Sequence, residues 1–168
     1  LISKKNYITD KLPGNFKRIG FILNAFPDSK IIHLQRNPMA VCWSNYKSNF
    51  NSTGMGFTLN QEYTAEYYLL YRDLMKFWSE RYSDKIININ YENLVENFEE
   101  EVKKLFFKLN LKWEKQLYDF HKNERPVETA SFMQVRNKIY KKSSEQWKSY
   151  KKYLTSMIDI LSSNNVEF

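Results

Sequence analysis

Two short, dense apolar runs separated by long helical patterns constrain the fold of this 168-residue chain most strongly. The first covers residues 30–36. It is flanked by residues that are typical of turns, Pro27-Asp28 before it and Asn37-Pro38 after it. The second covers residues 85–90. Short runs with a centre of Ile and Leu are typical of buried strands. Because strands that are joined through helices pair in parallel, the pattern predicts an α/β domain.

Helical periodicity fills most of the remaining chain. It predicts helices over residues 39–50, 60–82 and 92–109, packed on the sheet, with a short helix at 114–120 and another at 144–161. In the longest helix, apolar residues recur at steps of three and four and are expected to form its buried face. They are Tyr63, Tyr67, Leu70, Leu74, Phe77 and Trp78. Residues 125–140 have no clear period, and a polar segment of that length is a candidate site.

The composition indicates one globular domain. Hydrophobic residues make up 42% of the chain and aromatic residues 17%, which excludes a disordered chain. No apolar run approaches the about 20 residues of a membrane span, so we expect a cytoplasmic protein without membrane contact. The single cysteine, Cys42, excludes an intrachain disulfide and is expected to be a small buried apolar side chain. His33 and His121 lack metal-ligand spacing with each other or with Cys42, so no metal is expected.

The charge balance leaves two interpretations open. With 26 basic and 19 acidic residues, the net charge of +7 suits an anionic partner such as nucleic acid, a phosphorylated or sulfated molecule, or an anionic membrane face. Paired lysines such as Lys141-Lys142 are mostly solvated surface, which is the interpretation that we favour for the lysine surplus. No glycine-rich phosphate-binding motif of the P-loop or dinucleotide type occurs.

The end of the first predicted strand is the most informative position. Arg36 lies at the carboxyl end of that strand, and Ser44 lies one to two turns into the next helix. Ligands of open α/β sheets bind beyond the carboxyl ends of the strands, where an Arg fork and a helix N-terminus both favour a phosphate. Tyr91 and Glu92 occupy the equivalent place after the second strand. The alternative is that Arg36 pairs with a nearby carboxylate and that Ser44 faces solvent.

Several short motifs follow one another along the chain: Asp10-Lys11-Leu12-Pro13, Phe26-Pro27-Asp28-Ser29-Lys30, Arg36-Asn37-Pro38, Tyr91-Glu92-Asn93-Leu94, Arg125-Pro126-Val127-Glu128-Thr129-Ala130-Ser131, Gln134-Val135-Arg136 and Trp147-Lys148-Ser149-Tyr150. In their order and spacing they resemble those of the PAPS-dependent sulfotransferases. The similarity is to the bacterial branch that carries tetratricopeptide repeats and is related to the protein-tyrosine sulfotransferases, and it covers roughly residues 9–153. The resemblance implies a P-loop-NTPase-like α/β fold, with a parallel sheet flanked by helices. It also implies PAPS as donor without a metal, and an acceptor that bears a hydroxyl group.

The resemblance also implies roles for single residues. Those assigned to the cofactor are Arg36 and Ser44 on the 3′-phosphate, Tyr91 in the nucleotide pocket, and Ser131, Gln134, Val135 and Arg136 in the segment that wraps the nucleotide. Two positions are implied to be catalytic: Ser131 lies near the sulfuryl group, and Lys11 stabilises charge on it. Lys11 has a physical rationale as well, because a fixed ammonium stabilises the negative charge that builds on the leaving oxygen.

The chain also departs from the family pattern. Ser48, next to Lys47, stands where the tyrosine sulfotransferases have a further phosphate-binding Arg, and Gln146 replaces the cation before the last Trp. The glycine-containing loop for the 5′-phosphosulfate and the acidic general base would lie upstream of Lys11 and do not fit in the ten residues before it. The chain begins with Leu1. We therefore expect residues 1–168 to be a single partial domain whose N-terminal part is missing and which alone is inactive.

A second function from a different class stays open, namely a non-catalytic basic α/β module that binds nucleic acid or a phosphorylated ligand. Such a module interleaves basic and aromatic residues on one face and binds with a strong salt dependence. Here Lys and Arg are scattered among acidic residues across the predicted helices, so the sequence favours the sulfotransferase without nucleic acid as partner.

Overall fold

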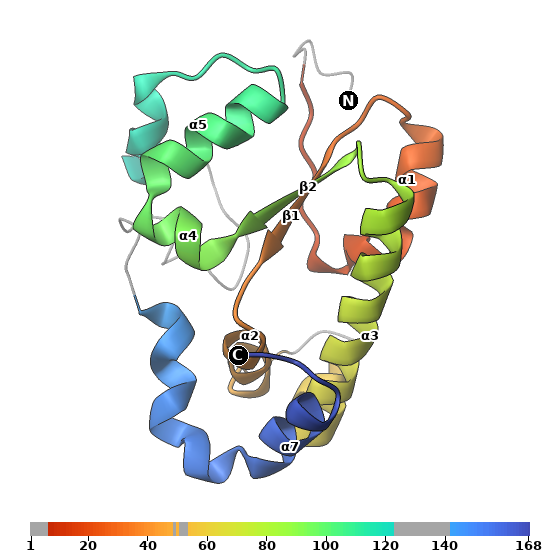
Figure 1. Ribbon diagram of the computed structural model, residues 1–168, viewed down its shortest axis with the longest axis vertical. Helices are drawn as coiled ribbons and strands as arrows, with labels where there is room; N and C mark the ends of the chain where they lie inside the picture. The colour runs from red at the N-terminus through yellow and green to blue at the C-terminus, as the bar shows by residue number, and fades with distance from the viewer. Residues whose placement is uncertain (1–6, 49, 51–53, 123–141) are drawn as a thin grey trace.

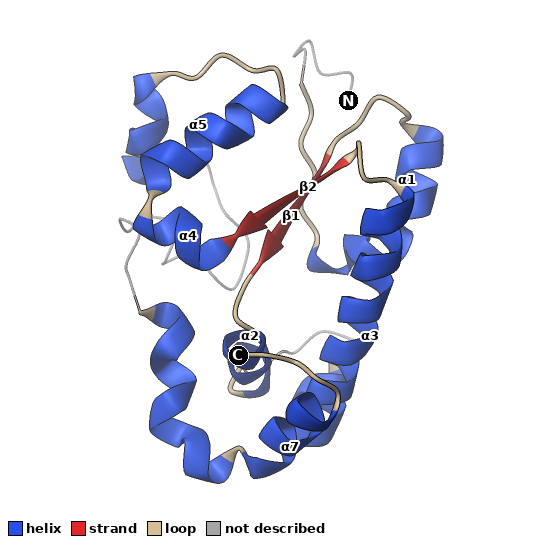
Figure 2. Ribbon diagram, in the orientation of Figure 1, coloured by secondary structure: helices blue, strands red, loops and turns tan. Residues whose placement is uncertain are grey.

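The structure is a computed structural model that describes residues 7–48, 50, 54–122 and 142–168. Its elements follow a mixed α/β order in which helices predominate (Figures 1 and 2). In chain order they are the 3-10 helix η1 (Pro13–Arg18), α1 (Ile19–Ala25), β1 (Ile31–Gln35), α2 (Pro38–Tyr46), η2 (Gly56–Leu59), α3 (Gln61–Arg81), β2 (Ile86–Asn90), α4 (Tyr91–Glu96), α5 (Phe98–Lys108), η3 (Lys115–Lys122), η4 (Ser143–Tyr153) and α7 (Thr155–Ser163). The polar segment 125–140 lies outside the described residues.

Strands β1 and β2 pair in parallel, with Ile31 opposite Ile86 and Gln35 opposite Asn90, and in the described residues they form a two-stranded sheet. Both predicted strands and their parallel direction are thus confirmed. Their burial is uneven: the three isoleucines of β2 are buried, whereas Ile32 and Leu34 of β1 are each 48% exposed. The prediction of a buried strand is therefore wrong for one face of β1.

Helix α3 matches the predicted bounds, but its buried face differs from the prediction. Tyr63, Leu70 and Phe77 are 59%, 67% and 49% exposed, so assigning them to the buried face is wrong. The buried positions are Thr64, Ala65 and Met75. The helix packs against η1 at one end and against α2 and α7 at the other, where the small side chain of Ala65 is buried (Figure 1).

Two predicted helices are each divided by one residue with non-helical dihedral angles. The helix expected over 92–109 becomes α4 and α5, separated at Asn97 (φ −122°, ψ 48°). The helix expected over 144–161 becomes η4 and α7, separated at Leu154 (φ −111°, ψ 28°). Both breaks preserve the apolar spacing, so periodicity alone does not reveal them. Helix α2 ends at Tyr46, before the predicted residue 50, and α1 was not predicted.

The buried hydrophobic residues of the described chain form two cores. The carboxyl-end core lies beyond the end of β1 and comprises Met39, Ala40, Cys42, Ala65, Trp147, Leu154, Met157 and Leu161. The sheet core comprises Ile19, Leu23, Met75 and Ile86. Helix α2 belongs to the carboxyl-end core, where it contacts α3 and η4, so the expectation that it packs on the sheet is wrong.

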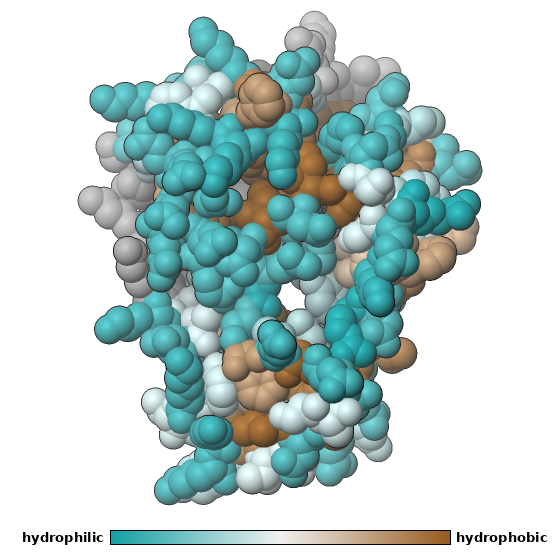
Figure 3. Space-filling model, in the orientation of Figure 1, coloured by the Kyte–Doolittle hydropathy of each residue, from teal (hydrophilic) through white to brown (hydrophobic). Residues whose placement is uncertain are grey.

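The buried position of Cys42 agrees with its prediction as a small apolar side chain. It is fully buried in the carboxyl-end core, and this burial raises the pKa of its thiol to about 12. On the surface, Figure 3 shows mostly hydrophilic residues, with hydrophobic ones visible over the two strands and near α7. Within the described ranges, no helix has the length and apolarity needed to cross a membrane.

Candidate functional site

The candidate site lies where the two parallel strands end. Asn37 caps α2 by accepting a hydrogen bond from the backbone N–H of Ala40 at 3.0 Å, and Pro38 opens the helix. Because Gln35 lies opposite Asn90, the residues that follow them emerge at the same edge of the sheet. The guanidinium carbon of Arg36 accordingly lies 5.0 Å from the centre of the Tyr91 ring. The structure therefore brings together two residues that the sequence assigned to one site.

The start of η4 completes a hydrogen-bonded network around Arg36. Arg36 donates from Nε to the Ser144 hydroxyl at 3.1 Å, and that hydroxyl donates to Oε1 of Glu92 at 2.5 Å. The same carboxylate oxygen accepts from the backbone N–H of Asn37 at 3.1 Å. The hydroxyls of Tyr91 and Ser143 lie 3.0 Å apart. Residues from the turn after β1, the start of α4 and the start of η4, far apart in the sequence, thus meet in one cluster.

Glu92 is held as a carboxylate in this cluster. Its partial burial alone would raise its pKa, but hydrogen bonds from Ser144 and Asn37, together with the charge of Arg36, lower the pKa of Glu92 below its usual range. The sequence left open that Arg36 pairs with a carboxylate. The structure shows no direct pair between Arg36 and Glu92, because the Ser144 hydroxyl bridges the two charged groups.

The structure shows what surrounds the two departures from the family pattern, Ser48 and Gln146. Lys47, at the end of α2, donates from Nζ to Oε1 of Gln146 in η4 at 3.0 Å, and the same Nζ lies 5.7 Å from the centre of the Trp43 ring. A cation thus lies beside Gln146, and α2 supplies it. Ser48 donates from its hydroxyl to the backbone carbonyl of Ser44 at 2.7 Å. Ser44 is half-buried in α2, and a shared ligand for Arg36 and Ser44 stays a prediction.

The remaining predicted site residues are not joined to this cluster. Lys11 is exposed in the segment before η1, and no hydrogen bond or ion pair between described residues involves it. Ser131, Gln134, Val135 and Arg136 lie outside the described residues. Across the described part of the chain, no group of three or more His, Cys, Asp and Glu side chains is arranged to hold a metal.

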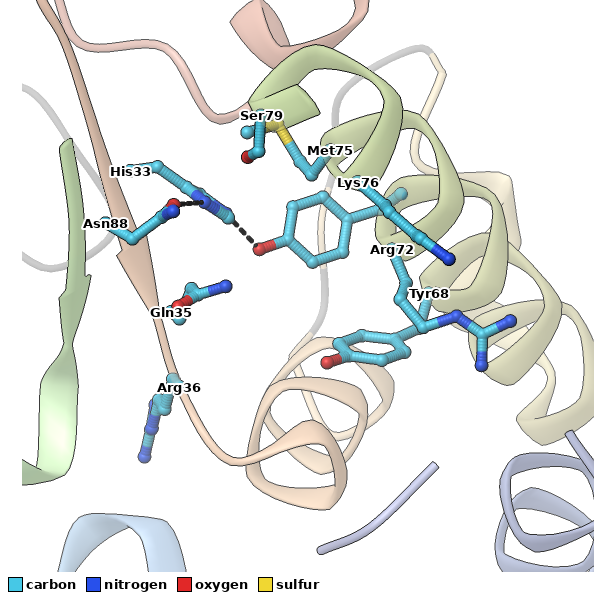
Figure 4. A pocket seen from close by; sticks show the side chains of 10 residues that line it. His33, Gln35, Arg36, Tyr68, Arg72, Met75, Lys76, Ser79 and Asn88 are labelled. Carbon is cyan, nitrogen blue, oxygen red and sulfur yellow. Dashed lines mark hydrogen bonds between the residues drawn. The ribbon is translucent and has the colours of Figure 1, made fainter. Parts of the chain in front are cut away.

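A cavity of about 320 Å³ lies between the two strands and α3, and Arg36 is among the residues that line it (Figure 4). Figure 4 shows the Arg36 side chain pointing away from the His33 side chain, which also lines the cavity. His33 contacts Oδ1 of Asn88 through Nδ1 at 2.7 Å and the Tyr71 hydroxyl through Nε2 at 2.5 Å. An amide oxygen only accepts, so Nδ1 carries the proton and Nε2 accepts from Tyr71. Both nitrogens of His33 are therefore occupied, and this imidazole ties the sheet to α3.

Sequence reasoning missed Ser143 and Ser144 as members of the site. They lie just before Trp147, inside the stretch that carried the family resemblance, but a pair of serines in a lysine-rich stretch carries no signal of its own. What places them is the anchoring of η4 by Trp147, which is 5% exposed in the carboxyl-end core.

Comparisons with known proteins support the sulfotransferase family as the general part of the resemblance seen in the sequence. The model of the family described as "Sulfotransferase family" matches residues 2–115. A relative from Aquifex aeolicus (strain VF5), described as an uncharacterized protein, is 40% identical over 163 residues, which are 96% of this chain and 21% of the relative. The chain thus spans about a fifth of the length of that relative. Because the family model covers more than half of the chain and includes Arg36 and Tyr91 at the strand ends, this protein belongs to the sulfotransferase family.

Proposed function

We propose that this chain forms the 3′-phosphate side of a PAPS site in a sulfotransferase with a P-loop-NTPase-like fold. The observation that carries this proposal is the position of Arg36, at the end of β1, against the Tyr91 ring and beside the first turn of α2. Among the described residues, the contacts of Arg36 use Nε and one face of the guanidinium. The two Nη nitrogens are therefore available for a bidentate contact with a phosphate.

The helix terminus supports an anion at the same place. The N-terminus of α2 begins directly after Arg36, and the positive end of a helix dipole favours a phosphate. Ser44 adds a neutral donor in this proposal, and the Tyr91 ring limits the orientation of the guanidinium. Gln134, Val135 and Arg136 are proposed to line the rest of the nucleotide.

The proposed chemistry places a cation where charge develops. When bound, PAPS supplies the sulfuryl group and leaves as adenosine 3′,5′-bisphosphate. Lys11 would stabilise the negative charge that builds on the leaving oxygen, and Ser131 would donate to the sulfuryl oxygens. Arg36, Ser44 and Tyr91 contribute by holding the distant 3′-phosphate, which fixes the position of the reacting end.

The acceptor in this proposal is a hydroxyl group, and the relation to protein-tyrosine sulfotransferases favours the phenol of a peptide tyrosine over other alcohols. The general base and the 5′-phosphosulfate loop would belong to a longer protein, which we propose carries tetratricopeptide repeats. The match to about a fifth of the Aquifex aeolicus relative supports such a longer architecture. A chain with one buried cysteine also suits the reducing cytoplasm, the compartment that we propose.

Calorimetric titration with adenosine 3′,5′-bisphosphate tests this proposal. Arg36→Ala is expected to weaken binding by about 1.5–3 kcal/mol, or about 10- to 150-fold, the usual value of a hydrogen bond to a charged group. The matched control is Arg81→Ala, because the guanidinium of Arg81 also stacks on a tyrosine, 5.6 Å from the Tyr82 ring, but outside the site. Unchanged binding by the Arg36 variant, or RNA that competes as well as the bisphosphate, would contradict the proposal and favour the nucleic-acid module.

A further inference from the structure

The Ser144 hydroxyl lies between two opposite charges of the candidate site. It accepts from Nε of Arg36 at 3.1 Å and donates to Oε1 of Glu92 at 2.5 Å. The charge of Arg36 contributes to the lowered pKa of Glu92, so the two groups interact electrostatically. The guanidinium and the carboxylate are nevertheless bridged by the hydroxyl and are not paired directly.

Direct pairing is what these two side chains would otherwise form. The planar fork of an arginine matches a carboxylate in two parallel hydrogen bonds. Arg36 and Glu92 are both half-buried, so water screens their attraction less than at an open surface. A guanidinium that is paired with Glu92 would offer less charge and fewer donors to an anionic ligand.

We infer that Ser144 is a positioning residue that keeps the guanidinium of Arg36 off the carboxylate of Glu92 and so keeps Arg36 available to an anion. The inference rests on the proposed function, since it concerns the same phosphate site. It gives a role to a residue of η4 that the resemblance left unassigned.

The position of Ser144 is held from both sides. The neighbouring Ser143 is buried, and its hydroxyl lies 3.0 Å from that of Tyr91. One turn further along η4, Trp147 is buried in the carboxyl-end core. Glu92 is fixed as well, because the backbone N–H of Asn37 donates to it at 3.1 Å. A spacer between two charges requires this kind of fixed placement.

Four proteins test the inference by calorimetric titration: the unaltered chain, Ser144→Ala, Glu92→Gln and the double variant. Ser144→Ala is expected to bind adenosine 3′,5′-bisphosphate about tenfold more weakly, because Arg36 then pairs with Glu92. Adenosine 5′-monophosphate, which lacks the 3′-phosphate, is expected to change by less than about twofold. Removing the carboxylate removes the competitor, so the double variant is expected to bind within about threefold of Glu92→Gln alone.

Two further variants separate positioning from a general structural effect. Ser144→Thr keeps the hydroxyl and is expected to bind like the unaltered chain, and Ser149→Ala removes an exposed serine of the same helix as a matched control. Unchanged binding by Ser144→Ala would overturn the inference. So would a loss that Glu92→Gln does not rescue, because it would mean that Ser144 contacts the ligand directly.

A ligand-free crystal structure of Ser144→Ala decides the spacer role independently of any nucleotide. The expected result is that Arg36 and Glu92 form a direct ion pair; a guanidinium that stays on the Tyr91 ring without contacting Glu92 would overturn the inference. If the unaltered chain binds no bisphosphate, the proposed function is wrong, and this structure still decides whether Ser144 separates the two charges.

Discussion

The two hydrophobic cores differ in how completely they exclude water. In the carboxyl-end core, Met39, Cys42, Met157 and Leu161 are each 0% exposed. The sheet core is smaller, and the neighbouring face of β1 leaves Ile32 nearly half exposed. The candidate site rests on the first of these, because α2 and η4 supply both its packed residues and the surroundings of Arg36. The end of the molecule that needs fixed geometry is thus the end that is packed most tightly.

The sheet core depends more on specific polar and aromatic contacts. The indole N–H of Trp78 donates to the Phe16 carbonyl at 2.9 Å, and His33 links Asn88 to Tyr71. Burial lowers the pKa of His33, although its hydrogen bond with Asn88 acts in the opposite direction. Such contacts fix orientation, but they bury less apolar area than interlocked side chains. We therefore expect the two cores to respond differently to substitution.

Removing a side chain from the carboxyl-end core is expected to have the largest effect. Leu161→Ala leaves a cavity at a fully buried position and is expected to lower the free energy of unfolding by about 2–5 kcal/mol. The control Leu70→Ala removes the same atoms from a position that is 67% exposed and is expected to change it by less than about 0.5 kcal/mol. Urea unfolding measures both, and equal losses would show that the cores are not as different as described.

Overfilling the sheet core is expected to have the next largest effect. A Cβ at Gly20 would lie 2.9 Å from Cη2 of Trp78, so Gly20→Ala requires the indole ring to shift. The expected loss is about 1–3 kcal/mol of unfolding free energy, with a change in tryptophan fluorescence. At Gly14 the nearest atom to an added Cβ is Cε of Lys17 at 3.8 Å, which makes Gly14→Ala the control. A parent-like Gly20→Ala would show that this core tolerates repacking.

Removing the N-cap of α2, which lies between the two cores, is expected to have a smaller effect on the free energy of unfolding. Asn37→Ala removes the acceptor for the Ala40 N–H and is expected to cost about 1 kcal/mol. Asn97→Ala is the control, since Asn97 precedes α5 without a side-chain capping bond. Hydrogen exchange of the α2 amides shows whether the loss is local to the helix that carries Ser44. If both variants lose the same stability, capping is not what holds the start of α2.

The smallest expected effect is the pH dependence from His33. Its pKa in the folded chain lies below the ordinary value of 6.5, so below about pH 6.5 the unfolded chain binds the proton more readily. The free energy of unfolding therefore decreases as the pH falls through this range. His33→Gln is expected to remove part of that decrease when unfolding is measured between about pH 7.5 and about pH 5. An identical pH profile for the variant would exclude this contribution.

The features that were predictable from the sequence depend on local pattern or on strand direction. The two strands and α3 follow from turn residues and periodicity, and Arg36 meets Tyr91 because parallel strands end at one edge. The break at Asn97 depends on a single pair of dihedral angles, which apolar spacing does not encode. Which face of α3 is exposed depends on where the other elements pack against the helix. Ser144 joins the site through packing across the whole chain, and no local signal marks it.

The single thiol of the chain offers a way to time the opening of the carboxyl-end core. Cys42 lies two residues before Ser44, is 0% exposed, and has a pKa of about 12, so the reactive thiolate is scarce and out of reach in the closed chain. A disulfide reagent therefore modifies it only as fast as α2 separates from α3. The rate of modification therefore measures how often α2 separates from α3, without an added probe. A ligand that binds at the start of α2 and stabilises this helix would lower the rate at which Cys42 is modified.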